Sequence, residues 1–357
     1  MYHESIVLIT RALSLFLLSF AVALALAPTL IRILYRYKCW KKKPRTETVG
    51  GAKTPIFTKL HAAKEVSTPR MGGILIWLTV LIVTAVGYLL ARLFPDSSLR
   101  HLNILSRSQT YLPLATLLAG SLLGLVDDLM VISDRGKYIG GGMRFKVRLI
   151  LISVIALVGA WWFYAKLGWS SLYVPFYGNI EIDGWYLVLF LVVTLATFSS
   201  GVVDGLDGLS AGVMIPIFAA YGAIAYTRGS YDLASFIVVL IGALVTYLWF
   251  NVHPAKFYMS ETGMMGLSVT LAVIAFLTNA VFFLPLIGAV LVVESASVLI
   301  QLISKRVFRR KVFLSAPIHH HLEALGWPES QITMRFWIIS FAASALGLVA
   351  FFLARYW

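Results

Sequence analysis

The sequence is dominated by apolar stretches of about 20 residues, the length that one α-helix needs to cross the core of a bilayer. The first stretch is too long for a cleaved signal peptide, so we interpret it as a membrane helix. We predict an all-α integral membrane protein, a single polytopic domain over residues 1–357 with about ten transmembrane helices. The predicted spans cover residues 5–35, 72–94, 112–132, 147–168, 185–203, 208–226, 234–251, 263–278, 280–304 and 334–355.

Composition supports a lipid environment. Hydrophobic residues make up 59% of the chain and charged residues only 13%, far from the quarter that is usual in soluble domains. The net charge of +14 sits in short loops between apolar spans, and the lack of a basic soluble domain disfavours nucleic acid as a partner. The bilayer is the expected partner instead. Cys39 is the only cysteine, which excludes an intrachain disulfide.

The basic residues alternate between loops. Ten lysines and arginines lie between residues 36 and 70, five between 135 and 148, and five between 305 and 311, while the intervening loops carry few. Positive charge concentrates in cytoplasmic loops of membrane proteins. We therefore predict that these three loops face the cytoplasm and that both termini are periplasmic or extracellular.

The acidic and histidine motifs fall on the same predicted side. Separate loops or span ends supply Asp127–Asp128, Asp204–Asp207, Glu261 and His319–His321. This shared placement predicts one composite cytoplasmic active site. Charge at membrane depth is costly and is therefore usually functional, although a solvated helix end would also explain Asp127 and Asp128.

Asp204 and Asp207 are three residues apart and share a face if they open a helix, but helix capping is an alternative role. Glu261 could ligate a hard cation such as Mg²⁺ or merely precede a helix. The three histidines could bind phosphate, relay a proton or ligate zinc, and zinc is disfavoured because cysteines and further ligands are missing. Glu294 lies inside a predicted span, where a structural hydrogen bond is the expected role.

Taken together, the segments from Lys64 to Arg335 resemble the polyprenyl-phosphate N-acetylhexosamine-1-phosphate transferases. The most specific element is Ala316–His321 with the trailing Gly326–Glu329, which is similar to the branch that handles muramoyl-pentapeptide. The resemblance implies a ten-helix fold in the bacterial inner (plasma) membrane and a Mg²⁺ cofactor. It also implies transfer from UDP-N-acetylmuramoyl-pentapeptide to undecaprenyl phosphate in peptidoglycan synthesis, giving lipid I and UMP.

For such a transferase we expect the following roles for residues of this chain. Asp127 is the expected base on the acceptor phosphate, and a covalent phospho-aspartate route through the same residue stays open. Asp128 and Glu261 are the expected Mg²⁺ ligands. The remaining expected site residues are Asp204, Asp207 and His319 for catalysis, and Lys64, Lys146, Asn251, His320 and His321 for substrate binding.

The chain also departs from the family pattern. Phe198 and Gly201 stand where the family has asparagines, Val131 stands in place of a lysine, and Ser260–Met264 reads Ser-Glu-Thr-Gly-Met instead of Gly-Asp-Thr-Gly-Ser. The Lys64–Thr68 segment is one residue longer. Two alternatives therefore remain: the same chemistry on another UDP-sugar, and a non-catalytic lipid-phosphate binder or transporter. A homodimer is compatible with the sequence and not required by it.

Overall fold

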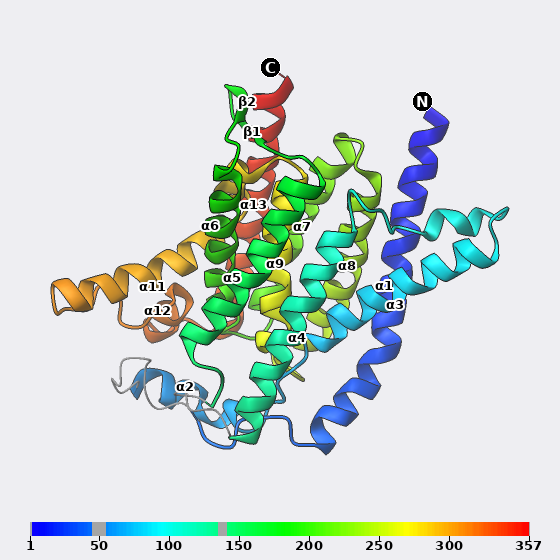
Figure 1. Ribbon diagram of the computed structural model, residues 1–357. Coiled ribbons are helices and arrows are strands. Elements are labelled where there is room, and N and C mark those ends of the chain that lie inside the picture. Colours follow the sequence, from blue (N-terminus) through cyan, green and yellow to red (C-terminus); the bar gives the residue numbers. More distant parts are fainter. Residues whose placement is uncertain (1, 45–54, 135–140, 357) are drawn as a thin grey trace.

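The computed structural model describes residues 2–44, 55–134 and 141–356 as a helical bundle (Figure 1). Four basic residues of the predicted cytoplasmic loops, Arg45, Lys53, Arg135 and Lys137, lie outside the described residues. The first half of the chain forms α1 (Tyr2–Arg36), α2 (Pro55–Glu65), α3 (Ile74–Leu93), η1 (Ser98–Leu102), α4 (Tyr111–Ser133), α5 (Phe145–Trp161), the π-helical turn η2 (Trp162–Lys166), β1 (Ser171–Val174) and β2 (Gly178–Glu181).

The second half forms α6 (Trp185–Ser199), η3 (Ser200–Val203), α7 (Leu209–Thr227), α8 (Tyr231–Asn251), α9 (Ser260–Leu277), η4 (Val281–Phe283), α10 (Leu284–Ile287), α11 (Ala289–Val307), α12 (Ile318–Ala324) and α13 (Glu329–Tyr356). The described residues contain nine helices that are long and apolar enough to cross a membrane, with a bent pair as a tenth candidate. The class of an integral helical membrane protein is thus confirmed. Both termini lie at the same end of the bundle (Figure 1).

The ninth predicted span is not one continuous helix. The sequence predicted a helix over residues 280–304, whereas the structure bends by 80° between Val281–Ile287 and Ala289–Val307. Pro285 lies in the first turn of α10 and Gly288 separates α10 from α11, so the junction combines a residue that lacks a backbone donor with one that disfavours regular helix. Beyond this break α11 leaves the bundle (Figure 1).

A short β-hairpin interrupts the otherwise helical chain. Strands β1 and β2 pair antiparallel, with Ser171 opposite Glu181 and Val174 opposite Gly178. The backbone N–H of Tyr173 donates to Asn279 Oδ1 at 2.8 Å, which fixes the hairpin to the end of α9. The hairpin was not expected, because four-residue strands are too short to give a clear alternating pattern.

Helix α9 is the centre of the bundle. Of its 18 residues 94% are buried, the largest share among the candidate membrane spans of the described residues. It packs against α4 through small residues: a Cβ atom added to Gly124 would lie 2.0 Å from the Glu261 carbonyl oxygen, and one added to Gly120 would lie 2.8 Å from Gly266 Cα. Small residues let membrane helices approach at the backbone. This approach brings the end of α4, with Asp127 and Asp128, to the start of α9.

We expect Gly124→Ala to destabilise the protein, because the added methyl group would overlap the α9 backbone. Overpacking of this kind typically costs about 1–3 kcal/mol. The matched control is Gly184→Ala, since a Cβ atom at Gly184 would meet no atom within 4 Å. The measurement is the thermal unfolding midpoint of the purified proteins in detergent. Equal midpoints for the two variants would contradict the close α4–α9 packing.

Candidate active site

Three polar clusters lie on α2, α12, the end of α4, the start of α9 and the segments beside them, and α2 and α12 lie away from the termini (Figure 1). We call them the acidic cluster, the lysine cluster and the histidine cluster. The acidic cluster consists of Asp127, Asp128, Asp204 and Glu261 with Arg70 and Arg148; the lysine cluster of Lys64, Asp207, His253 and Glu329; and the histidine cluster of His61, His320 and Glu323.

Asp128, in the last turns of α4, is fully buried. Its Oδ1 atom accepts a hydrogen bond from Arg70 Nε at 3.0 Å and lies 3.0 Å from Arg70 Nη2. Its Oδ2 atom accepts from the Thr262 backbone N–H at 3.0 Å and from the Thr262 hydroxyl at 2.6 Å. A carboxylate offers about four lone-pair sites, so these contacts use all of them. Asp128 thereby joins α4, the start of α9 and the segment before α3.

Asp127 and Glu261 share Arg148, which lies in the first turn of α5. Arg148 Nη1 donates to Glu261 Oε1 at 2.6 Å and lies 3.8 Å from Asp127 Oδ2. The Met143 backbone N–H donates to Asp127 Oδ1 at 2.6 Å. A Cβ atom on Gly142 would lie 2.8 Å from Asp127 Oδ1, so the backbone of the loop before α5 packs directly against this carboxylate. Both carboxylates keep lone pairs that these contacts do not use.

Asp204, at the end of η3, completes the acidic cluster. Its two oxygens accept hydrogen bonds from the Ser210 hydroxyl and from the Ser260 backbone N–H, each at 2.8 Å. Burial raises the pKa of Asp204, and these two hydrogen bonds oppose that shift. Ser260 has φ of 59°, a conformation that glycine adopts more readily. A glycine would therefore adopt this conformation at the start of α9 with less strain than Ser260 does.

The lysine cluster surrounds the ammonium group of Lys64, which comes from α2. Lys64 is hydrogen-bonded to Glu329 and lies 3.7 Å from Asp207 Oδ2. Asp207 also lies 2.9 Å from His253 Nδ1. Burial alone would lower the pKa of Lys64, but the hydrogen bond and the negative charges of Glu329 and Asp207 raise it. Lys64 is therefore a cation at neutral pH.

His319 lies against the Asp204–Asp207 segment. It is fully buried, and its Nδ1 atom lies 2.9 Å from Glu294 Oε2. Burial lowers the pKa of His319 to about 3, so its ring is neutral at pH 7. Its Nε2 atom is buried without a hydrogen-bond partner, and a Cβ atom on Gly205 would lie 2.2 Å from it. Glu294 has the structural hydrogen bond that the sequence led us to expect.

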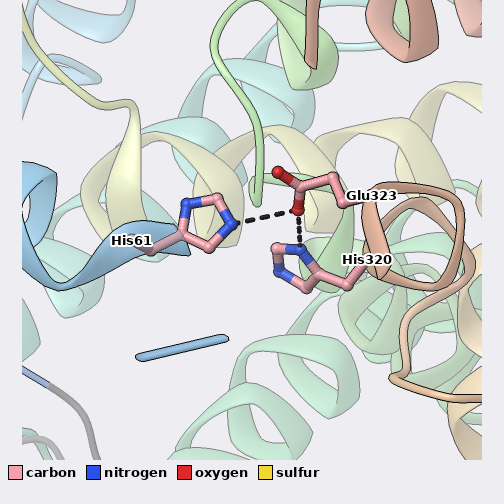
Figure 2. Close-up of side chains that lie close together, drawn as sticks. All are labelled: His61, His320 and Glu323. Carbon is pink, nitrogen blue, oxygen red and sulfur yellow. Dashed lines mark hydrogen bonds and ion pairs between the residues drawn. The ribbon is translucent and has the colours of Figure 1, made fainter. Parts of the chain in front are cut away.

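The histidine cluster joins α2 to α12 (Figure 2). Glu323 Oε2 lies 3.0 Å from His61 Nε2 and 2.6 Å from His320 Nδ1. Burial lowers the pKa of His320 to about 4. Burial alone would raise the pKa of Glu323, but the hydrogen bonds with His320 and His61 lower it to about 2. At neutral pH the cluster thus holds one carboxylate between imidazoles, of which that of His320 is neutral.

Most of the residues predicted from the sequence gather at this end of the bundle. Asn251 lies beside the lysine cluster, where its Oδ1 atom accepts from the Gly208 backbone N–H at 2.9 Å. His321 does not join His319 and His320 in their contacts. Its Nδ1 atom accepts a hydrogen bond from the Leu314 backbone N–H at 3.2 Å. Lys146 is exposed at the start of α5. The expected substrate contacts of these three residues stay predictions.

Several residues of these clusters were not singled out as site residues. They are Arg148 in the acidic cluster, His253 and Glu329 in the lysine cluster, and His61 and Glu323 in the histidine cluster. Some signals existed: Arg148 is a charge at the start of an apolar helix, and His61 precedes Lys64 by three residues on one helix. Which partner each would find depends on helices far apart in the sequence.

The fold is that of a helical membrane protein with polar clusters at one end, and comparison with known proteins identifies its class as a transferase. The model of the family described as Glycosyl transferase family 4 matches residues 110–279. This stretch runs from the start of α4 to the end of α9 and contains all four carboxylates of the acidic cluster.

Individual relatives make the assignment specific. The phospho-N-acetylmuramoyl-pentapeptide-transferase of Geobacillus sp. (strain WCH70) is 34% identical over 336 residues, which cover 93% of this chain and 95% of that protein. The protein of the same name from Rubrobacter xylanophilus is 34% identical over 296 residues, 81% of this chain and 84% of that protein. The chain belongs to the phospho-N-acetylmuramoyl-pentapeptide-transferase family.

The contacts of Asp128 generate a stability prediction. Removing one partner of a buried ion pair typically costs about 3–5 kcal/mol, because the other charge stays buried without compensation. We expect Asp128→Asn and Arg70→Gln each to lower the thermal unfolding midpoint, and the double variant to lose less than the sum of the two. The corresponding cycle for the exposed pair Lys43–Asp134 is the control and should show almost no coupling. Additive losses at Arg70 and Asp128 would contradict the pairing.

Proposed function

We propose that this protein transfers phospho-N-acetylmuramoyl-pentapeptide from UDP to undecaprenyl phosphate, giving lipid I and UMP. The observation that carries this proposal is the acidic cluster at the end of α4 and the start of α9, within a chain that belongs to this family. In the reaction, an oxygen of the lipid phosphate attacks the phosphorus that carries the sugar. The bond to the uridine-bearing phosphate breaks, and UMP leaves with the bridging oxygen.

Mg²⁺ fits the chemistry of the acidic cluster. Four carboxylates against two guanidinium groups leave a formal excess of two negative charges in a largely buried site. Oxygen ligands are the ones that Mg²⁺ prefers. Glu261, Asp127 and Asp204 keep lone pairs for such an ion, whereas the lone pairs of Asp128 are engaged by Arg70 and Thr262. We therefore assign the ligand role first to Glu261, and Asp128 to holding the cluster together. When bound, Mg²⁺ would neutralise the charge of the diphosphate.

Asp127 is the proposed base. The Met143 N–H holds its Oδ1 atom, and Arg148 lies 3.8 Å from its Oδ2 atom, so the carboxylate is fixed in one orientation. A fixed carboxylate can take the proton of the acceptor phosphate as the new bond forms. Phosphoryl transfer depends mainly on positioning and on charge neutralisation, which the neighbouring arginines and Lys64 can supply.

His319 is the proposed contact for a donor phosphate, in the tautomer in which Nε2 carries the proton and can donate to a phosphate oxygen. Its buried Nε2 atom has no hydrogen-bond partner, and a buried polar atom of this kind is costly unless a ligand completes it. Gly205 permits this position of the ring, because a Cβ atom there would lie 2.2 Å from Nε2. Lys64 lies on the flanking helix α2 and adds a positive charge near the phosphates.

The test of the function is release of UMP by the purified protein supplied with undecaprenyl phosphate, Mg²⁺ and one donor at a time. UDP-N-acetylmuramoyl-pentapeptide should support turnover and UDP-N-acetylglucosamine should not. Turnover with the second donor alone would favour the chemistry on another sugar. Binding of the lipid phosphate without turnover on either donor would favour a non-catalytic lipid-phosphate binder.

We further propose a plasma-membrane location with the three clusters facing the cytoplasm. Single cysteines introduced in a Cys39→Ser background would test it, at Lys42 and Lys311 against Asp96 and Tyr177, all of them exposed. We expect an impermeant thiol reagent applied to intact cells to label positions 96 and 177 only. Labelling of positions 42 and 311 alone would reverse the orientation.

We expect Asp127→Asn to abolish most turnover while the protein stays folded. Loss of a proton-transfer group typically lowers the rate about 10²–10⁴-fold. Asp134→Asn is a suitable control, because Asp134 follows the same helix and is exposed. Rates are measured across a pH series, and a near-normal rate for Asp127→Asn at any pH would remove this residue from the mechanism.

Glu261 gives the sharpest prediction for Mg²⁺, because this chain has a longer carboxylate arm than the family pattern. We expect Glu261→Gln to lose most activity, since it removes the ligand charge. We expect Glu261→Asp to bring no improvement, because a side chain shorter by one methylene group would draw the carboxylate away from Arg148, which Glu261 contacts at 2.6 Å. Activity is measured against Mg²⁺ concentration for the three proteins. An unchanged Mg²⁺ dependence in Glu261→Gln, or better activity of Glu261→Asp at lower Mg²⁺, would contradict the assignment.

A further inference from the structure

The histidine cluster has the composition of a transition-metal site. His61 Nε2, His320 Nδ1 and Glu323 Oε2 lie within 4.8 Å of one another, with all three side chains largely buried. His320 and Glu323 are three residues apart on α12 and therefore share a face, while His61 approaches from α2 (Figure 2). Two imidazole nitrogens and one carboxylate oxygen are a ligand set that proteins use for Zn²⁺.

The distances are close to those that such an ion requires. Zn²⁺ binds nitrogen and oxygen ligands at about 2.0–2.2 Å, so neighbouring ligand atoms of a tetrahedral site lie roughly 3.3 Å apart. The two imidazole nitrogens lie 3.0 and 2.6 Å from Glu323 Oε2. An increase of less than about 1 Å in these two separations would bring them to the spacing of such a site, and the two imidazole nitrogens lie within 4.8 Å of each other.

The neighbouring lysine cluster provides a contrast. Asp207, His253 and Glu329 also offer three ligand atoms within 4.8 Å. The ammonium group of Lys64, however, is hydrogen-bonded to Glu329 and lies 3.7 Å from Asp207 Oδ2, so the chain itself supplies the cation there. In the histidine cluster the partners of the carboxylate are imidazoles, which can give up a proton and bind a metal through the nitrogen.

We propose that His61, His320 and Glu323 form a binding site for a divalent transition metal of the Zn²⁺ class, which fastens α2 to α12. Three protein ligands would leave one position open, to be filled by water. Nitrogen-containing ligand sets select such ions over Mg²⁺, which requires oxygen ligands. The site is therefore distinct from the acidic cluster in both position and chemistry. It does not depend on the proposed transfer reaction, because the ion can be measured without either substrate.

The experiment uses the full-length protein, purified without a polyhistidine tag, stripped with a chelator and kept in excess Mg²⁺. Titration with Co²⁺ should give the visible absorption of a four-coordinate ion, and Zn²⁺ should displace it. His61→Gln and Glu323→Gln should each weaken binding at least about 100-fold, because losing even an outer partner of a metal ligand costs about 10–100-fold. His321→Gln is the matched control on the same helix, and His253→Gln the control for the lysine cluster; both should bind as the wild type does.

Absence of this spectrum in the wild type would overturn the proposal. Equal metal affinity of His61→Gln, Glu323→Gln and the wild type would also overturn it. A loss of metal binding in His253→Gln alone would overturn it as well. Gel filtration checks that each variant is folded. If the two ligand variants do not fold, zinc-edge X-ray absorption of the wild type decides, with two imidazoles in the first coordination shell expected and fewer than two contradicting the site.

Discussion

The buried carboxylate of Asp128 is the interaction on which the rest of the site depends. A charge that is removed from water must find compensation from opposite charge and hydrogen bonds. Arg70 supplies the charge, and Thr262 supplies a backbone and a hydroxyl donor. The donors come from the segment before α3 and from the start of α9. The position of Asp128 therefore determines how three distant parts of the chain meet.

Close packing of the helices makes this arrangement possible. Gly124 lets the α4 backbone reach that of α9, one turn before Asp127 and Asp128. The residue before Thr262 is Glu261, which is thereby placed beside Arg148 and near Asp127. Gly124 in the apolar part of the bundle and Asp128 at its end thus act together. The close helix packing and the buried charge both hold the acidic cluster in place.

The sequence predicted those features that local physical chemistry determines. Hydrophobic runs located most spans, because a bilayer sets the length of an apolar helix. The cost of charge at membrane depth singled out Asp127, Asp128 and Glu294. The break at Gly288 was missed, because the apolar run continues across it and hydropathy does not register an 80° bend. The pairs Arg148–Glu261 and His61–Glu323 could not be predicted, because each joins residues more than 100 positions apart.

The central claim is that the acidic cluster joins a muramoyl-pentapeptide phosphate to a lipid phosphate. The most direct measurement is mass spectrometry of the lipid product, formed by the purified protein from UDP-N-acetylmuramoyl-pentapeptide and undecaprenyl phosphate in the presence of Mg²⁺. We predict a product with the mass of undecaprenyl diphosphate bearing N-acetylmuramoyl-pentapeptide from the wild type, and almost none from Asp127→Asn. No such lipid from the folded wild-type protein, or equal amounts from both proteins, would contradict the account.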